Sequence, residues 1–116
     1  TNFTGAILKH VLMSECLGRY CNFSFAHIQD SCFQTCDFTK MGMTEAKLTR
    51  ILLEGCCLTE AEMLNTPLKD VNLTTNDLQG IRLCGSELQG AIISSLQAVD
   101  LIRIFGVSIQ DWIISQ

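Results

Sequence analysis

The residues in this sequence best suited to chemistry are its thiols, its imidazoles and one close pair of carboxylates. The cysteines are odd in number, and none of their spacings matches a zinc ribbon or a redox motif, which indicates free thiols in a reducing cytosol. No serine, cysteine or carboxylate is spaced to form a nucleophilic set with His10 or His27, so both are expected on the surface. Glu60 and Glu62 could act as general acid and base if they faced one cleft. The seven cysteines are Cys16, Cys21, Cys32, Cys36, Cys56, Cys57 and Cys84.

The composition narrows the classes of function. The chain has 116 residues, of which 47% are hydrophobic and 17% charged, which favours one folded domain and excludes a disordered chain. Its net charge of −4 argues against a protein that binds nucleic acid through a basic surface. The most apolar window, residues 91–109, contains Asp100 and Arg103, so no membrane span is expected. The chain begins TNFTG, and we expect it to be processed or a piece of a longer protein.

A repeat of five residues must position any functional side chain. Every fifth residue from Phe3 to Ile93 is large and apolar, with Gly18 as the exception, and the residue two positions earlier is mostly small or β-branched. Since five fits neither a helix nor a long strand, the chain must turn at every repeat. Four turns close a square coil of twenty residues, and successive coils would stack about 4.8 Å apart. We expect the core stack to contain Phe23, Phe33, Phe38, Leu53, Leu58, Leu73 and Leu78.

The twenty-residue spacing decides the chemistry of the candidate residues. It stacks Cys16, Cys36 and Cys56 in one inward column with Asn76 next, where parallel Cβ atoms about 4.8 Å apart favour packed thiols over a disulfide. Asn76 would then be a buried polar residue that needs backbone partners. Glu60 and Glu62 fall on different faces. We therefore predict no enzymatic activity and no metal or cofactor, because an enzyme would need a substrate-sized pocket that a filled coil hardly permits.

Two local features are expected to depart from the regular coil or to add to it. At Gly18 the central apolar side chain is missing, so either Leu17 swings inward through a bulge or the coil is pinched, and we expect a distortion over residues 17–20. His10 would lie beneath Asp30, where a modest ion pair is possible.

The repeat units CDFTK, AKLTR, TPLKD, VNLTT, NDLQG and SELQG resemble the A(D/N)LXX unit of the pentapeptide-repeat family. The resemblance covers residues 1–95 without a change of phase. It implies an all-β solenoid, a right-handed quadrilateral β-helix, followed by a C-terminal capping α-helix. The alternative is an ordinary amphipathic domain.

The repeat stops after Ile93, and the segment that follows predicts one helix that begins after Ser94 or Ser95 and ends before Gly106. This gives two regions, a β-helix over residues 1–95 and a capping helix with a dimerisation tail over residues 96–116. Apolar residues surround the helix, so one side should cover the open end of the stack and another should form a homodimer. Alternatively, the tail folds back over the cap. The expected dimer residues are Leu101, Ile104, Phe105, Trp112 and Ile113.

The expected faces of the coil carry a weak field. One face carries only Glu15 and Glu54, two further faces are net −1, and the fourth is net +1. An anionic surface and an ordinary solvated surface both fit this arrangement. The expected partner-binding residues are Glu15, Asp37, Glu54, Glu60 and Asp77.

The segments SCFQTCDFTK, EGCCLTEAEM and LQAVDLIRIFGVSI resemble the quinolone-resistance (Qnr) branch of the family. The resemblance implies a cytoplasmic protein that mimics DNA, binds DNA gyrase or topoisomerase IV and protects the enzyme from quinolones, without binding nucleic acid itself. A single chain would form a rod of only about 23 Å, so an end-to-end dimer or a longer parent chain is needed. The alternative is a passive scaffold or protein-interaction module with an unknown partner.

Overall fold

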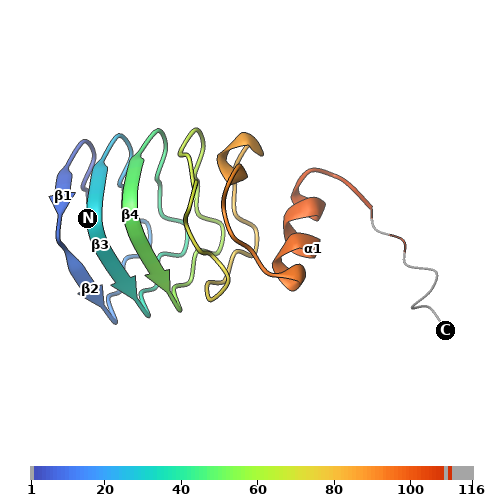
Figure 1. Ribbon diagram of the computed structural model, residues 1–116, viewed down its shortest axis with the longest axis horizontal. Coiled ribbons are helices and arrows are strands. Elements are labelled where there is room, and N and C mark those ends of the chain that lie inside the picture. Colours follow the sequence, from blue (N-terminus) through green and yellow to red (C-terminus); the bar gives the residue numbers. More distant parts are fainter. Residues whose placement is uncertain (1, 109, 111–116) are drawn as a thin grey trace.

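A computed structural model describes residues 2–108 and 110 of the chain. Its strands are β1 (Ile7–Lys9), β2 (Leu12–Ser14), β3 (His27–Gln34) and β4 (Lys47–Glu54). A short 3-10 helix, η1 (Ser86–Leu88), and the α-helix α1 (Ser95–Ile104) follow. In Figure 1 the strands lie side by side at the N-terminal end, and α1 lies at the opposite end.

Parallel pairing joins residues that are twenty positions apart. Strands β1 and β2 both pair with β3, and β3 pairs with β4, in a register that aligns Met13 with Phe33 and Phe33 with Leu53. Isolated parallel bridges continue the same spacing beyond the strands, as between Cys57 and Asp77. We call each twenty-residue segment a coil, numbered from the N-terminus. The twenty-residue register that the five-residue repeat predicts is therefore present.

The turns between repeats use left-handed backbone conformations. From Gly5 to Gly90 every fifth residue has a positive φ, with Thr75 as the exception, and most of these residues are not glycine. Thr35, for example, has φ 53° and Glu45 has φ 53°. The sequence predicted turns at these positions from their occasional glycines, but the conformation is general. A left-handed conformation costs a residue with a Cβ roughly 1–2 kcal/mol, so stacking must repay this cost at each corner.

The interior is filled by the large residues of the repeat. Aromatic rings dominate its first half: the Phe3 and Phe23 rings stack with centroids 4.9 Å apart, and Phe38 meets Phe23 and Phe33 edge-on at 6.0 Å and 5.8 Å. Such pairs contribute about 0.5–1.5 kcal/mol each beyond the apolar area that they bury. All residues expected in the core stack are buried: Phe23, Phe33, Phe38, Leu53, Leu58, Leu73 and Leu78.

The expected distortion at Gly18 is wrong. Leu17 points outward with 87% of its surface exposed, and it bridges Asp37 in the normal register. Gly18 N donates to Asp37 O at 2.7 Å, so the backbone is neither bulged nor shifted there. The neighbouring coil fills the space instead, because a Cβ on Gly18 would lie 2.7 Å from the Phe38 ring. The large ring of one coil thus compensates for the missing side chain of the other.

Helix α1 covers the open end of the stack and is fixed to the fourth coil by one buried glutamine. Ser94 and Gln97 form a capping box, in which Gln97 N donates to Ser94 Oγ and Ser94 N donates to Gln97 Oε1. Gln97 Nε2 donates to Leu73 O at 2.6 Å and to Asn76 O at 2.8 Å. Since carbonyls at the end of a stack have no further coil to pair with, this side chain completes their hydrogen bonding.

The Gly18–Phe38 contact gives the first prediction. Restoring the usual large residue with Gly18→Leu should lower the free energy of unfolding by about 1–3 kcal/mol, because the new side chain overlaps the Phe38 ring. In the double variant Gly18→Leu/Phe38→Leu the loss should be smaller than the sum of the two single losses. Urea unfolding of the four proteins measures this coupling. Additive losses would contradict the contact.

The corner conformation gives the second prediction. Thr35→Gly should raise the free energy of unfolding by about 1 kcal/mol, because Thr35 is exposed and carries a Cβ in a left-handed conformation. Thr49→Gly is the matched control, since Thr49 is also exposed but lies inside β4, where glycine should destabilise. Thermal or urea unfolding checks both signs, and a loss of stability in Thr35→Gly would refute the argument.

Candidate functional site

The predicted partner-binding carboxylates lie on two neighbouring sets of repeat units, and the coils separate them. Asp37 and Asp77 belong to one outward column, with Cys57 between them and Leu17 at its N-terminal end. Glu54 closes β4, and Glu15 follows β2. Along the column that holds Asp37 the positive charge of Arg19 lies near the N-terminal end, so the column is not uniformly negative.

Ion pairs in the described residues join one coil to the next. Arg50 binds Asp30 through two nitrogens, Arg82 Nη1 lies 3.5 Å from Glu62 Oε1, and Lys40 Nζ lies 3.9 Å from Glu60 Oε2. Each of these pairs links residues twenty positions apart. His10 was expected to be the partner of Asp30, but Arg50 takes this place. Exposed pairs of this kind contribute about 0–1 kcal/mol each, so they mainly align the coils.

Among the predicted partner-binding carboxylates, Asp37 accepts several hydrogen bonds from its own chain. It accepts hydrogen bonds from the Thr39 hydroxyl at 2.6 Å, the Thr39 amide at 3.1 Å and Arg19 Nε at 2.7 Å. The Thr39 hydroxyl first, and then Arg19, lower the pKa of Asp37 to about 2. Asp37 and Glu60 are thus partly neutralised, whereas Glu15, Glu54 and Asp77 have no ion pair within the described residues.

The predicted inward column of thiols is present in part: Cys36 and Cys56 are buried and bind backbone, whereas Cys16 at its N-terminal end is exposed. Cys36 Sγ donates to Met13 O at 3.6 Å, and Cys56 Sγ donates to Phe33 O at 3.3 Å. Burial raises the pKa of both thiols, so they stay protonated and unreactive near neutral pH. The expected backbone partners of Asn76 are confirmed: its Oδ1 accepts from Cys56 N and its Nδ2 donates to Leu53 O.

Sequence reasoning did not single out Glu87, which is buried. Only 3% of its surface is exposed, and its carboxylate accepts hydrogen bonds from three backbone amides, those of Asn65, Cys84 and Gly85, at 2.8–3.1 Å. Burial alone would raise the pKa of Glu87, but these amides outweigh it and the pKa is lowered. The carboxylate therefore fixes the turn before η1 and links the fourth and fifth coils. Nothing in the sequence around this glutamate indicates that it is buried and binds backbone amides.

The predicted dimer residues fall into three groups. Leu101 is buried in the core of its own chain, and Ile104 packs against that core, so both serve the cap. Phe105 is 42% exposed. Trp112 and Ile113 lie outside the described residues. On α1 and just beyond it, the exposed apolar residues are Leu96, Ile102, Phe105 and Val107. The dimer contact stays a prediction.

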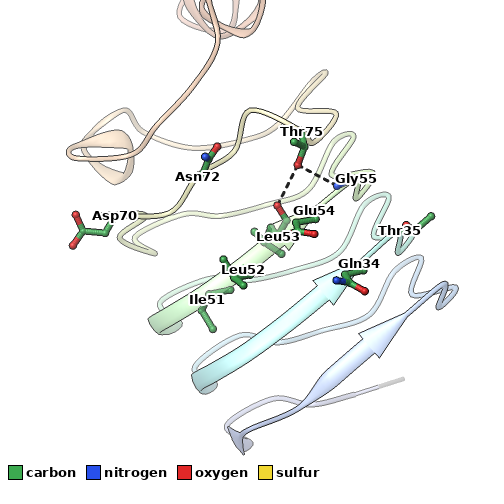
Figure 2. Close-up of a pocket in the computed structure, with 10 residues that line it drawn as sticks. All are labelled: Gln34, Thr35, Ile51, Leu52, Leu53, Glu54, Gly55, Asp70, Asn72 and Thr75. Carbon is green, nitrogen blue, oxygen red and sulfur yellow. Dashed lines mark hydrogen bonds between the residues drawn. The ribbon is translucent and has the colours of Figure 1, made fainter.

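A groove runs along β4, between the third and fourth coils (Figure 2). One wall is β4 and the residue after it, including Leu52 and Glu54, and the other runs from Asp70 through Asn72 to Thr75. Its volume is about 460 Å³. No backbone hydrogen bond or β-bridge joins residues 47–54 to residues 67–74 in the described part of the chain. The groove therefore coincides with an interruption of the backbone ladder.

Side chains bridge both ends of this interruption. At one end Thr66 Oγ1 accepts from Ala46 N and donates to Met43 O. At the other end Thr75 Oγ1 accepts from Gly55 N at 3.2 Å, beside the bonds that Asn76 makes. Pro67 explains part of the opening, because proline has no amide proton to donate to the third coil. Polar side chains thus replace the backbone pairing around the groove.

Residues 2–108 and 110 were also compared with the requirements of a metal site, a membrane-spanning helix and a pair of catalytic carboxylates. No group of three or more His, Cys, Asp or Glu side chains could hold a metal ion there. No helix in this range is long and apolar enough to cross a membrane. Glu60 and Glu62 are each paired with a cation from a neighbouring coil.

Comparisons with known proteins agree on the type of repeat. A family model described as a pentapeptide repeat region matches residues 1–63. A trypsin-treated form of QnrB1, a plasmid-mediated fluoroquinolone resistance protein, is similar at 18% identity over 94% of this chain and 85% of that one, with a TM-score of 0.37. No curated protein sequence matches the chain.

Two cyanobacterial structures are similar to about the same degree. HetL from Nostoc sp. strain PCC 7120, a pentapeptide repeat protein involved in heterocyst differentiation regulation, shares 21% identity with a TM-score of 0.41. The match covers 81% of this chain and 52% of HetL, so the chain spans about half the length of HetL. Rfr23 from Cyanothece 51142 shares 16% identity over 81% of this chain and 88% of that one, also with a TM-score of 0.41. These values do not distinguish one function from another.

The buried carboxylate gives the third prediction. Glu87→Gln should lower the free energy of unfolding by about 1–3 kcal/mol at pH 7, because an amide NH₂ cannot accept from Asn65, Cys84 or Gly85. Since folding lowers the pKa of Glu87, its contribution is present above the unfolded-state pKa of about 4.3 and is lost as the pH falls through the folded value.

The stability difference between Glu87→Gln and the unchanged protein should therefore shrink on acidification, as measured by urea unfolding between pH 7 and pH 3. Glu45→Gln is the control, because Glu45 is exposed. A difference that stays constant with pH would show that the Glu87 charge does not matter.

Proposed function

This chain belongs to the pentapeptide-repeat family, and from this membership we propose that it is a right-handed, four-sided β-helix that binds a type II topoisomerase as a DNA mimic. DNA gyrase or topoisomerase IV is the proposed partner, and protection of that enzyme from quinolones is the proposed effect. The observation that carries the proposal is that three of the predicted contact carboxylates, Glu15, Glu54 and Asp77, are exposed and have no ion pair within the described residues.

The shape of the molecule supports this proposal. The two shorter dimensions are 25 Å and 24 Å, which is close to the width of a DNA duplex, and the chain carries a net charge of −4. A basic channel that accepts DNA would attract such a rod by electrostatic steering. We propose a cytoplasmic location because the partner enzyme acts on intracellular DNA.

We propose binding without catalysis. The interior of each coil is filled by apolar side chains, and the buried thiols and Glu87 are bound to backbone groups. An activity that needs a general base would require a group free to accept a proton at the reacting atom. The proposed role of the chain therefore rests on its shape and surface charge.

A homodimer is part of the proposal. One chain is too short to present a long charged surface, and the exposed apolar residues Leu96, Ile102 and Phe105 lie at the end that α1 covers. Pairing two such ends would double the length of the rod and bury apolar surface.

A passive scaffold is the second candidate. It is favoured by the ion pairs between coils, since Asp37 and Glu60 bind Arg19 and Lys40 of the same chain and are less available to a partner. A scaffold would tolerate the loss of any one exposed carboxylate. The two candidates therefore differ in their response to charge reversal.

The fourth prediction compares two charge reversals of equal size. Glu54→Lys should weaken binding to purified DNA gyrase roughly three- to tenfold at low salt, mainly through slower association, because it reverses an unpaired carboxylate on the proposed contact surface. Glu45→Lys is the control, since Glu45 is also exposed and without an ion pair in the described residues but is not one of the proposed contact residues. Surface plasmon resonance at two salt concentrations measures both.

A supercoiling assay with a quinolone provides the functional measurement. The unchanged protein should restore gyrase activity at micromolar concentration, and Glu54→Lys should do so less well than Glu45→Lys. Equal behaviour of the two variants would favour the scaffold. Absence of any binding by the unchanged protein would remove the topoisomerase proposal.

A further inference from the structure

The interruption along β4 leaves two neighbouring backbone donors without their usual acceptors. In the regular coils the amide of each central residue, and the amide two residues later, donate to the next coil, as those of Phe23 and Phe25 do at 2.7 Å and 2.9 Å. By the same pattern the amides of Leu48 and Arg50 face the fourth coil. Neither amide has a backbone acceptor in the fourth coil among the described residues.

The carbonyls beside these two amides face the other way. Gly42 O and Thr44 O accept from the preceding coil, and Lys47 and Thr49 hold the same two positions in the next repeat. By this pattern the carbonyls of Lys47 and Thr49 face β3, with which β4 pairs. This part of β4 therefore presents donors to the groove, and unpaired backbone amides of this kind attract anions.

A polar hollow of about 740 Å³ lies beside these amides. It joins the groove of Figure 2, because Ile51, Leu52 and Asp70 line both. Thr49 and Lys69 line it as well, so a hydroxyl and an ammonium group border the donors of β4. This lining suits a small polar ligand.

Positive charge is available on this face of the rod. Lys9, Lys47 and Lys69 are exposed and have no ion pair within the described residues. Arg50 also lines the hollow, but its charge is shared with Asp30, which it binds through two nitrogens. Lys69 is therefore the lining cation that can pair with a ligand.

The carboxylates of the same face do not oppose such a ligand. Asp30 is neutralised by Arg50, and the buried Glu87 accepts from backbone amides. Asp70 lines the hollow, but Figure 2 shows its carboxylate pointing away from β4. A negative group beside the donors of β4 would thus meet mainly positive charge.

We propose that the amides of Leu48 and Arg50, together with the Lys69 ammonium, bind a phosphate group, either free or carried by a small molecule. The two amides lie at most about 6.6 Å apart along the strand, so two oxygens of one phosphate can accept from both. Lys69 pairs with its charge. The net charge of −4 disfavours a long polyanion, which favours a single phosphate group over a nucleic acid. The topoisomerase proposal is not needed for this inference.

Amide chemical shifts measure this binding directly. Titration of the full chain with inorganic phosphate, at constant pH and ionic strength, should shift the amide resonances of Leu48 and Arg50 along one saturating curve. Leu8 and His10 hold the same positions in the first coil and serve as internal references. Their amides should not follow this curve, because Leu8 lies in β1, which pairs with β3, and His10 N donates to Gln29 O at 3.1 Å.

A pair of matched variants tests the role of the lysine. Lys69→Gln should weaken phosphate binding about fivefold, because it removes the cation beside the amides. Lys9→Gln is the control and should change binding little. Lys9 holds the same position in its repeat and is likewise exposed without an ion pair in the described residues, but it lies three coils away, beside paired amides.

The same titration with glycerol 3-phosphate distinguishes the two sources of the phosphate group. Tighter binding than inorganic phosphate assigns the site to a phosphate ester, and weaker binding assigns it to free phosphate; either result supports the proposal. Three results would overturn it: no saturable shift at Leu48 and Arg50, an equal response of the Leu8 and His10 amides, or equal weakening by the two lysine variants, which would indicate only a diffuse positive field.

Discussion

Hydrogen bonding between residues twenty positions apart is the constraint on which this fold depends. A five-residue repeat that turns at its last position places like residues above one another, so each coil provides the donors and acceptors that its neighbour requires. The corners are costly, since residues such as Thr35 and Glu45 hold a left-handed conformation despite having a Cβ. The fold persists because stacked backbone pairing and the filled interior together outweigh these local costs. Each feature of the surface then follows from the position of a residue within its repeat and its coil.

The sequence predicted those parts of the structure that repeat, because every five-residue unit shows the same pattern of residue types. The twenty-residue register, the buried column of central residues and the backbone partners of Asn76 all follow from counting in fives. The helix after Ser94 was predictable because a capping serine and a terminal Gly106 enclose its apolar run. Features that occur once were missed. At Gly18 the space is filled by the Phe38 ring of another coil. Glu87 is buried because the backbone amides of Asn65, Cys84 and Gly85 all donate to its carboxylate.

Some carboxylates on the surface bind groups of the same chain, and others are free to contact a partner. Cations of one coil neutralise carboxylates of the next, as Arg50 does for Asp30, so formal charge overstates the field that a partner would meet. The pKa is lowered for Asp37 and Glu87, which accept several local hydrogen bonds, and for Asp30, which binds Arg50, and all three stabilise turns or coil contacts. A partner that recognises negative charge would therefore depend on carboxylates that the fold does not use. Glu54 is such a residue, and it borders the groove along β4.

Pro67 also affects how the stack of coils would come apart. Stacked repeats gain their cooperativity from each interface with the nearest neighbour, and the interface between the third and fourth coils lacks part of its backbone pairing. Fewer backbone hydrogen bonds consequently hold these two coils together. Under load or partial denaturation the rod should separate into an N-terminal block of three coils and a C-terminal block that α1 holds together through Gln97. One residue without an amide proton can thus contribute to a boundary between two units of unfolding within a single continuous stack.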